Sequence, residues 1–150
     1  MSQARLCALE ARIRDNIPLT PHLAFSLLDW DGQTLVMRAP LAENINDKGT
    51  MFAGSQSALL TLAGWACTTL AGESLLDKVD VVAVRSNLEY QAPVASDAQI
   101  EAVAEEPSLQ RFRDRLPRSG RASLGVQARL LDSEGRVASR FTAPSMARRI

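Results

Sequence analysis

A run of twenty-four residues without a single Asp, Glu, Lys or Arg, from Gly49 to Gly72, constrains this sequence more than any other feature. Charged residues make up 23% of the whole chain, so the run stands apart from its surroundings. A segment of this length and polarity is a membrane span, a buried core helix or the wall of a binding site.

The composition of the run argues against a membrane span. A spanning helix needs about 20 predominantly apolar residues, whereas this run contains four glycines, four threonines, two serines and one glutamine. Residues 49–54 are typical of a loop, because they combine glycines with Thr50. The remainder predicts a helix from Ser55, which acts as its cap, to Gly72, which ends it in a left-handed conformation. Its apolar residues lie on nearly every side, so we expect the helix to be buried.

Length and charge predict one domain over residues 1–150, with an N-terminal helix in residues 1–16. Lys plus Arg and Asp plus Glu number 17 each, so no global charge favours nucleic acid or a membrane surface. The first residues lack the apolar core of a secretory signal. Cys7 and Cys67 have no neighbours at metal-ligand spacing and are interpreted as reduced thiols, with Cys67 in the core. We expect a cytoplasmic protein without a metal or a cofactor.

Most of the remaining chain has the pattern of strands. The dipeptide Asp31-Gly32 predicts a hairpin between two strands, and Asp132 to Gly135 predicts another turn. Apolar residues alternate with polar ones over 121–131. The apolar first half of 79–90 favours a strand buried on both faces. The predicted strands cover residues 23–30, 34–39, 79–90, 97–105, 121–131 and 137–143.

This order, with one long apolar helix after the first hairpin, predicts an α+β fold with five or six mostly antiparallel strands curled around the helix. The pattern alone leads no further than this fold class.

Two segments resemble a known family. The first is Asn44-Ile-Asn-Asp-Lys-Gly49-Thr-Met-Phe52-Ala-Gly54-Ser, followed by the apolar helix with Gly64-Trp65. The second is Val84-Arg-Ser86-Asn-Leu-Glu-Tyr90-Gln-Ala-Pro93-Val. Both are similar to the thioesterase family typified by the C-terminal domain of YiiD, over roughly residues 17 to 145. The resemblance implies a hotdog fold, in which an antiparallel sheet wraps the long helix. It also implies a homodimer or dimer of dimers, with an acyl-CoA site between subunits.

Thioester hydrolysis needs donors for the developing oxyanion and a group that activates water or attacks directly. The start of the predicted helix, at Ala53-Gly54-Ser55, offers unpaired N–H groups and the positive end of the helix dipole. Gly54 allows a substrate close to the backbone. The alternative interpretation is that Gly54 only turns the chain and Ser55 only caps the helix.

The base is harder to identify from the sequence. Many hotdog thioesterases carry a carboxylate about two turns into the helix, where this chain has Leu60, Thr61 and Leu62. Asp47 stands where the family often has histidine, and it is the carboxylate closest in sequence to the expected oxyanion site. Asp47 is therefore the candidate base, with Asn46 and Thr61 as polar contacts to water or substrate. The alternative for Asn44, Asn46 and Asp47 is ordinary turn chemistry.

Two other chemistries fit poorly. No Gly-x-Ser-x-Gly motif occurs, and the one histidine, His22, lies outside the loop before the helix. This argues against a serine hydrolase. It also argues against a dehydratase of the hotdog type, which relies on a histidine in or near that loop.

Five arginines gather between residues 111 and 121, offset only by Asp114. Because the arginine fork suits phosphate, they are candidates for holding the nucleotide end of coenzyme A. The alternatives are a solvated segment, helical over 108–116, or a nucleic-acid contact. Only Phe112 interleaves the arginines as an aromatic, so nucleic acid is the least favoured.

The sequence thus predicts hydrolysis of an acyl-CoA or related acyl thioester, and the alternative is a non-catalytic acyl-ligand-binding hotdog protein. A purely structural oligomeric module is a third reading. The predicted catalytic residues are Asp47, Asn46, Gly54, Ser55 and Thr61. The predicted substrate-binding residues are Asn44, Gly49, Thr50, Phe52, Ser86, Asn87, Tyr90, Arg113, Arg118 and Arg121.

Overall fold

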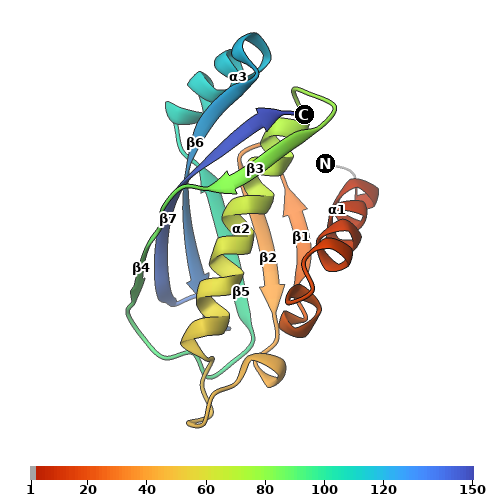
Figure 1. The fold of residues 1–150 in the computed structure, drawn as a ribbon. Coiled ribbons are helices and arrows are strands. Elements are labelled where there is room, and N and C mark those ends of the chain that lie inside the picture. Colours follow the sequence, from red (N-terminus) through yellow and green to blue (C-terminus); the bar gives the residue numbers. More distant parts are fainter. Residues whose placement is uncertain (1–2) are drawn as a thin grey trace.

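The computed structural model of the chain describes residues 3–150 and contains one long helix held in the concave face of a curved antiparallel sheet (Figure 1). The helices are α1 (Gln3–Asn16), α2 (Ala53–Glu73) and α3 (Ser108–Ser119), with short 3₁₀ turns η1 (Thr20–Leu23) and η2 (Ala42–Asn44). The strands are β1 (Ser26–Trp30), β2 (Thr34–Ala39), β3 (Val79–Ala83), β4 (Asn87–Tyr90), β5 (Ala98–Ala104), β6 (Arg121–Leu131) and β7 (Val137–Arg149).

The sheet has the order β1-β2-β5-β6-β7-β3, and β4 also pairs with β7. All of these pairings are antiparallel. Because β3 and β4 follow one another along the same side of β7, they occupy a single edge position. This confirms the predicted α+β fold with a curved antiparallel sheet.

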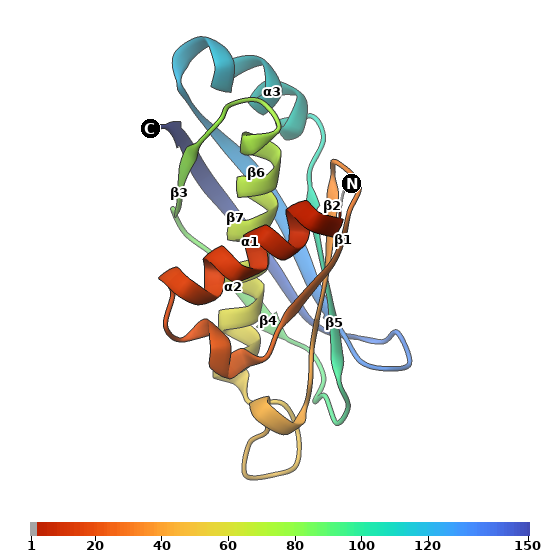
Figure 2. The ribbon, with the colours of Figure 1, turned by 90° about the vertical axis from the view of Figure 1, so that its right-hand side faces the viewer.

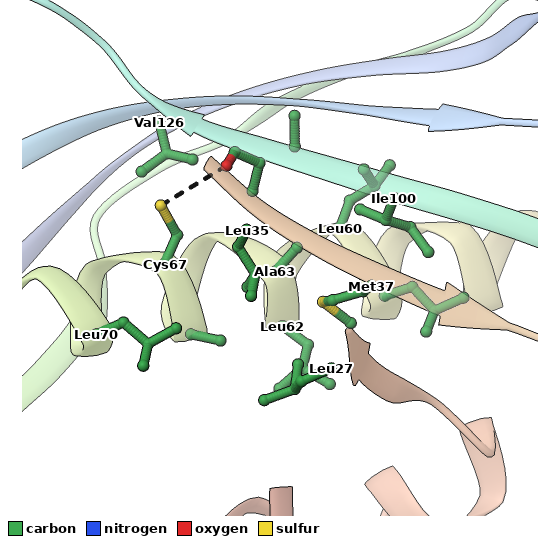
Figure 3. Packing of buried hydrophobic residues seen from close by; sticks show 14 of the residues in the cluster. Leu27, Leu35, Met37, Leu60, Leu62, Ala63, Cys67, Leu70, Ile100 and Val126 are labelled. Atoms are coloured by element: carbon green, nitrogen blue, oxygen red, sulfur yellow. Dashed lines mark hydrogen bonds between the residues drawn. The ribbon is translucent and has the colours of Figure 1, made fainter. Parts of the chain in front are cut away.

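The core lies between α2 and the sheet, as Figure 3 shows. Leu60, Ala63 and Cys67 of α2 are fully buried. They face strand residues such as Leu35 and Ile100 (Figure 3). Truncation of a buried leucine such as Leu60 to alanine typically costs about 2–5 kcal/mol. The predicted place of Cys67 in the core is confirmed.

Helix α1 packs across β1 and the C-terminal half of α2 (Figure 2). Leu6, Leu9 and Ile13 form its buried stripe. Arg12 pairs with Glu73 at 2.9 Å, and the Arg5 guanidinium donates to the Leu70 carbonyl oxygen. Helix α1 therefore covers α2 near its end and leaves its beginning open.

The two turns and the alternating burial of β6 agree with the predictions from the sequence. Gly32 and Gly135 have positive φ, as the two predicted turns require. The Asp31 carboxylate accepts the N–H groups of Gln33 and Thr34. In β6 the residues of the apolar face are buried as predicted: Leu124, Val126, Ala128 and Leu130.

Both predicted ends of α2 were wrong. The helix begins at Ala53, with Phe52 as N-cap residue and no side-chain cap, so Ser55 lies inside the first turn. Gly72 lies within the helix, which continues to Glu73 and ends at Ser74 in right-handed conformation. A Cβ on Gly72 would approach Val79 to 3.0 Å. Close packing against β3 is thus the physical reason for this glycine.

The prediction of one buried strand over 79–90 was also wrong. The segment divides into β3 and β4, and the side chains of Val82 and Val84 are each 53% exposed. The apolar run lies at the sheet edge, where no element of residues 3–150 covers its second face. Smaller differences occur at the first strand, which begins at Ser26, at β7, which extends to Arg149, and at α3, which includes Pro117.

No helix within residues 3–150 is both long enough and apolar enough to cross a bilayer.

Candidate functional site

The loop that leads into α2 is held in place by Asn44. Its Nδ2 group donates to the carbonyl oxygens of Leu23 and Pro40, both at 2.9 Å, and its backbone carbonyl oxygen accepts the Phe52 N–H at 2.7 Å. The side chain is buried. Since both amide protons are used inside the protein, Asn44 acts in this structure as an anchor of the loop.

The start of the same loop is tied to β5 through Asp97. Its carboxylate accepts the Leu41 N–H at 2.9 Å and an N–H of Arg38 at 3.3 Å. These two donors, the backbone one foremost, hold the pKa of Asp97 below its usual range.

The tip of the loop is a turn built by Asn46. The Asn46 Oδ1 atom accepts the N–H groups of Lys48 and Thr50, and its Nδ2 donates to the Thr50 hydroxyl at 2.8 Å. Gly49 follows with a φ of 82°. Asp47 projects from this turn, 83% exposed, and pairs with Lys48 at 3.0 Å. Asn46, Gly49 and Thr50 therefore support the loop, and Asp47 is the solvent-exposed carboxylate at its tip.

The beginning of α2 carries three consecutive amides without an acceptor. The N–H groups of Ala53, Gly54 and Ser55 have no hydrogen-bond partner within residues 3–150, whereas the next amide, of Gln56, donates to the Phe52 carbonyl. Ala53 and Gly54 are exposed. The positive end of the helix dipole adds to these donors. The arrangement suits a carbonyl oxygen that gains negative charge.

The Phe52 side chain lies over this helix start. A Cβ on Gly54 would stand 2.3 Å from the Phe52 ring, so the ring occupies the space that the absent side chain leaves. The ring is 53% exposed. A substrate that reaches the Gly54 amide must therefore displace or stack against Phe52.

Tyr90 joins the sheet edge to the same helix start. Its hydroxyl donates to the Ala53 carbonyl oxygen at 3.1 Å. Because alternate residues of a strand point to the same side, Leu88 lies on the same side as Tyr90, where it packs against the core. Asn87 instead lines a hollow on the outer face of the sheet together with Arg140. Ser86 is exposed in the connection between β3 and β4. Of these three predicted residues, the structure brings Tyr90 to the helix start.

Gln56 was missed by the sequence analysis. It is buried in the first turns of α2, its Nε2 donates to the Met51 carbonyl oxygen at 3.1 Å, and its Oε1 accepts the Ser139 hydroxyl of β7. It thereby links the loop, the helix and the sheet. The signal was available, because Gln56 carries the only side-chain amide of the charge-free run and a buried amide requires partners.

Further along α2, Thr61 is exposed, while Leu60 and Leu62 on either side are buried. The first turn contains no acid. The only carboxylate in α2 is Glu73 at the opposite end, where it pairs with Arg12. Thr61 is thus the polar side chain that α2 presents to solvent two turns after its beginning.

The three predicted phosphate-binding arginines do not converge. Arg113 donates to the Gly32 carbonyl oxygen at 3.3 Å, and Arg118 pairs with Asp114 at 2.8 Å. Arg121 lines a hollow with Arg111 and Arg115. All three belong to α3 or the beginning of β6, at the end of the molecule opposite the loop before α2 (Figure 1).

The comparisons with known proteins fit this geometry. A model of the family described as "Putative thioesterase (yiiD_Cterm)" matches residues 6–148. The chain belongs to this family. The match extends over nearly all of the described elements, from α1 to β7, and so it includes the loop and helix start described above.

Solved structures share the fold. A putative thioesterase from Shewanella oneidensis has 27% sequence identity and a TM-score of 0.83, over 97% of this chain and 99% of that chain. A protein of unknown function from Chlorobaculum tepidum has 26% identity and a TM-score of 0.81, over 95% and 93% of the two chains. A thioesterase from Haemophilus influenzae, with 16% identity and a TM-score of 0.71, covers 91% of this chain and 85% of its own and shows likeness of fold alone.

The predicted hotdog fold is therefore confirmed. The family supports thioester hydrolysis as the general chemistry of the protein.

Proposed function

We propose that this protein hydrolyses acyl-CoA thioesters at the start of α2. The observation that carries the proposal is the set of three unpaired N–H groups on Ala53, Gly54 and Ser55 at an exposed helix N-terminus. When a nucleophile attacks the thioester carbonyl, negative charge gathers on its oxygen, and donors already in place stabilise that charge without reorganising.

Water activation is assigned to Asp47. This carboxylate is exposed on the loop that ends at the N-cap residue Phe52. It would accept the proton of the attacking water, with Lys48 as its ionic partner in the resting protein. Thr61 is exposed on α2 and is proposed as a polar contact to water or to the acyl group.

The active form is proposed to be a homodimer or a dimer of dimers. Edge strands β3 and β4 pair with β7 on one side, and no strand of residues 3–150 pairs with the other side. This edge exposes Val82, Val84 and Tyr90, each more than half exposed, and the Tyr90 hydroxyl contacts the Ala53 carbonyl oxygen at the helix start. An apolar strand edge is commonly covered by a second copy across a twofold axis. Such a copy would complete the wall of the acyl site.

A non-catalytic acyl-ligand-binding protein is the second candidate. It is favoured by the absence of any acid in the first turn of α2 and by the high exposure of Asp47, whose only ionic partner within residues 3–150 is the neighbouring Lys48. Binding would then use the same N–H groups without turnover.

Steady-state loss of thioester from a panel of acyl-CoAs tests the proposal. The loss should be followed by its ultraviolet absorbance, because the exposed Cys7 thiol would itself react with a thiol reagent. Turnover on any acyl-CoA supports hydrolysis. Binding of a thioether analogue without turnover on the panel would favour the second candidate, and neither binding nor turnover would contradict both. Light scattering at micromolar concentration tests assembly, and a monomer would contradict the shared site.

A further inference from the structure

A hollow of about 420 Å³ lies where α3 meets β6 and β7, at the far end of the molecule from the loop before α2. One face of α3 supplies residues at positions 108, 111, 115 and 119, the spacing of a single helical stripe. The side chains with polar groups that line the hollow are Ser108, Arg111, Arg115, Ser119, Arg121 and Ser123.

The helix that carries this stripe is firmly seated. The adjacent stripe of α3 consists of Leu109, Phe112 and Leu116, which are at most 1% exposed. The Ser108 hydroxyl accepts the Gly125 N–H of β6 at 2.9 Å. The backbone that carries Arg111 and Arg115 therefore belongs to a packed helix, and both residues line the hollow.

The charges around the hollow are unbalanced. Arg111, Arg115 and Arg121 form no ion pair within residues 3–150, although Arg118 pairs with Asp114 on the same helix. Glu105 lies beside Ser108 near Gly125, but no carboxylate of the described chain is among the lining residues. Arg111 and Arg115 stand four residues apart on the stripe of α3 that lines the hollow. Like charges at this spacing repel each other, and a bound anion would offset that repulsion.

We infer that this hollow binds a phosphate-bearing anion of the pyrophosphate or nucleotide type. Each guanidinium can donate two parallel hydrogen bonds to phosphate oxygens, and three of them match several negative charges at once. The Ser123 hydroxyl adds a further donor. The inference stands without the proposed hydrolysis. If the substrate is acyl-CoA, its own phosphates are one source of the anion, delivered from the acyl site of a second copy.

Calorimetric titration of the purified protein with inorganic pyrophosphate at low ionic strength tests the inference. We expect binding that Arg111→Gln and Arg115→Gln each weaken about tenfold or more, because each loses a charge-assisted contact. Arg113→Gln is the matched control on the same helix and should change affinity less than about twofold. All three side chains are exposed, so folding is preserved and can be checked by thermal unfolding. No binding, or equal weakening in all three variants, would overturn the inference.

Two further measurements then identify the source of the anion. They are the binding of adenosine 3′,5′-bisphosphate and the KM values of two thioesters. If Arg115→Gln raises KM for an acyl-CoA and leaves the matching N-acetylcysteamine thioester unchanged, the bound anion is part of the coenzyme. If both KM values stay unchanged while pyrophosphate binding falls, the site serves a separate phosphate ligand. Because the pyrophosphate titration needs no turnover, it decides the inference even if the protein hydrolyses no thioester.

Discussion

The Tyr90 hydroxyl donates a hydrogen bond to the carbonyl oxygen of Ala53, so the sheet edge is tied to the first residue of α2 across 3.1 Å. This contact joins the two features on which the proposed site depends, the unpaired helix amides and the exposed apolar edge. It also fixes the direction in which the Ala53 peptide faces.

Tyr90→Phe is expected to lower kcat/KM several-fold while it lowers the free energy of unfolding by no more than about 1 kcal/mol, since the hydroxyl is partly solvated. Glu89→Gln is the matched control, because Glu89 lies on the outer face of the same strand. Steady-state kinetics and urea unfolding of both variants measure the effects. Equal activity of the two variants would show that the contact has no part in turnover.

Gly54→Ala is expected to abolish most activity, because the new methyl group meets the Phe52 ring and fills the space beside the helix amides. Loss of one oxyanion donor typically costs about 10²–10³ in kcat, and blocked access should be comparable. The double variant Phe52→Ala with Gly54→Ala separates two causes. If displacement of Phe52 alone causes the loss, the double variant regains the activity of Phe52→Ala. We expect it to stay inactive.

Asp47→Asn is expected to lower kcat by about 10²–10⁴, the usual contribution of a general base, with folding intact. Glu43→Gln, on the exposed turn η2 of the same loop, should have no effect. Thr61→Val is the companion change, because it deletes a hydroxyl and keeps the shape. Full activity in Asp47→Asn with a loss in Thr61→Val would move the polar role to α2. Full activity in both would leave the helix amides and a water held by Asn46.

Burial raises the pKa of the Cys67 thiol to about 12. An unfolded cysteine ionises near pH 8.5, so above that pH the unfolded state loses protons that the folded state keeps. The free energy of unfolding should therefore fall as the pH rises from about 8.5 towards 12, by up to about 1.4 kcal/mol per pH unit from this group.

Chemical unfolding between pH 7 and pH 10 measures this slope, and Cys67→Ala should remove that part of it. In the native protein at neutral pH, a thiol reagent should modify the exposed Cys7 and leave Cys67 unmodified. Rapid modification of both thiols without denaturant would contradict the buried position of Cys67.

The sequence predicted the parts of the fold whose signals are local. Asp31-Gly32 specifies its hairpin through the Asp31 carboxylate and the positive φ of Gly32. The alternation in β6 reports directly which side chains are buried. The ends of α2 were predicted wrongly, because Ser55 and Gly72 are residue types that often cap helices. In the structure Ser55 lies inside the first turn, and Gly72 packs closely against Val79. Val82 and Val84 are apolar residues of the kind that fill protein cores. The sheet order is needed to see that they lie at an edge.

The sequence placed the candidate site at the loop before α2 and the beginning of that helix, which starts two residues before the predicted Ser55. The partners of Asn44 and Gln56 depend on contacts between distant segments. The arginines were grouped by their nearness in sequence. The helical period places Arg111 and Arg115 on one face and turns Arg113 away from it, and this arrangement can be seen only when the start and the buried stripe of α3 are known.

A crystal structure with an acyl-CoA analogue that keeps the carbonyl group and replaces sulfur by methylene would test the central claim most directly. We expect the carbonyl oxygen about 2.7–3.1 Å from an amide nitrogen of Ala53, Gly54 or Ser55. We also expect the acyl chain to run along Phe52 and Tyr90. An analogue bound elsewhere, with these three amides still facing solvent, would contradict the proposed site.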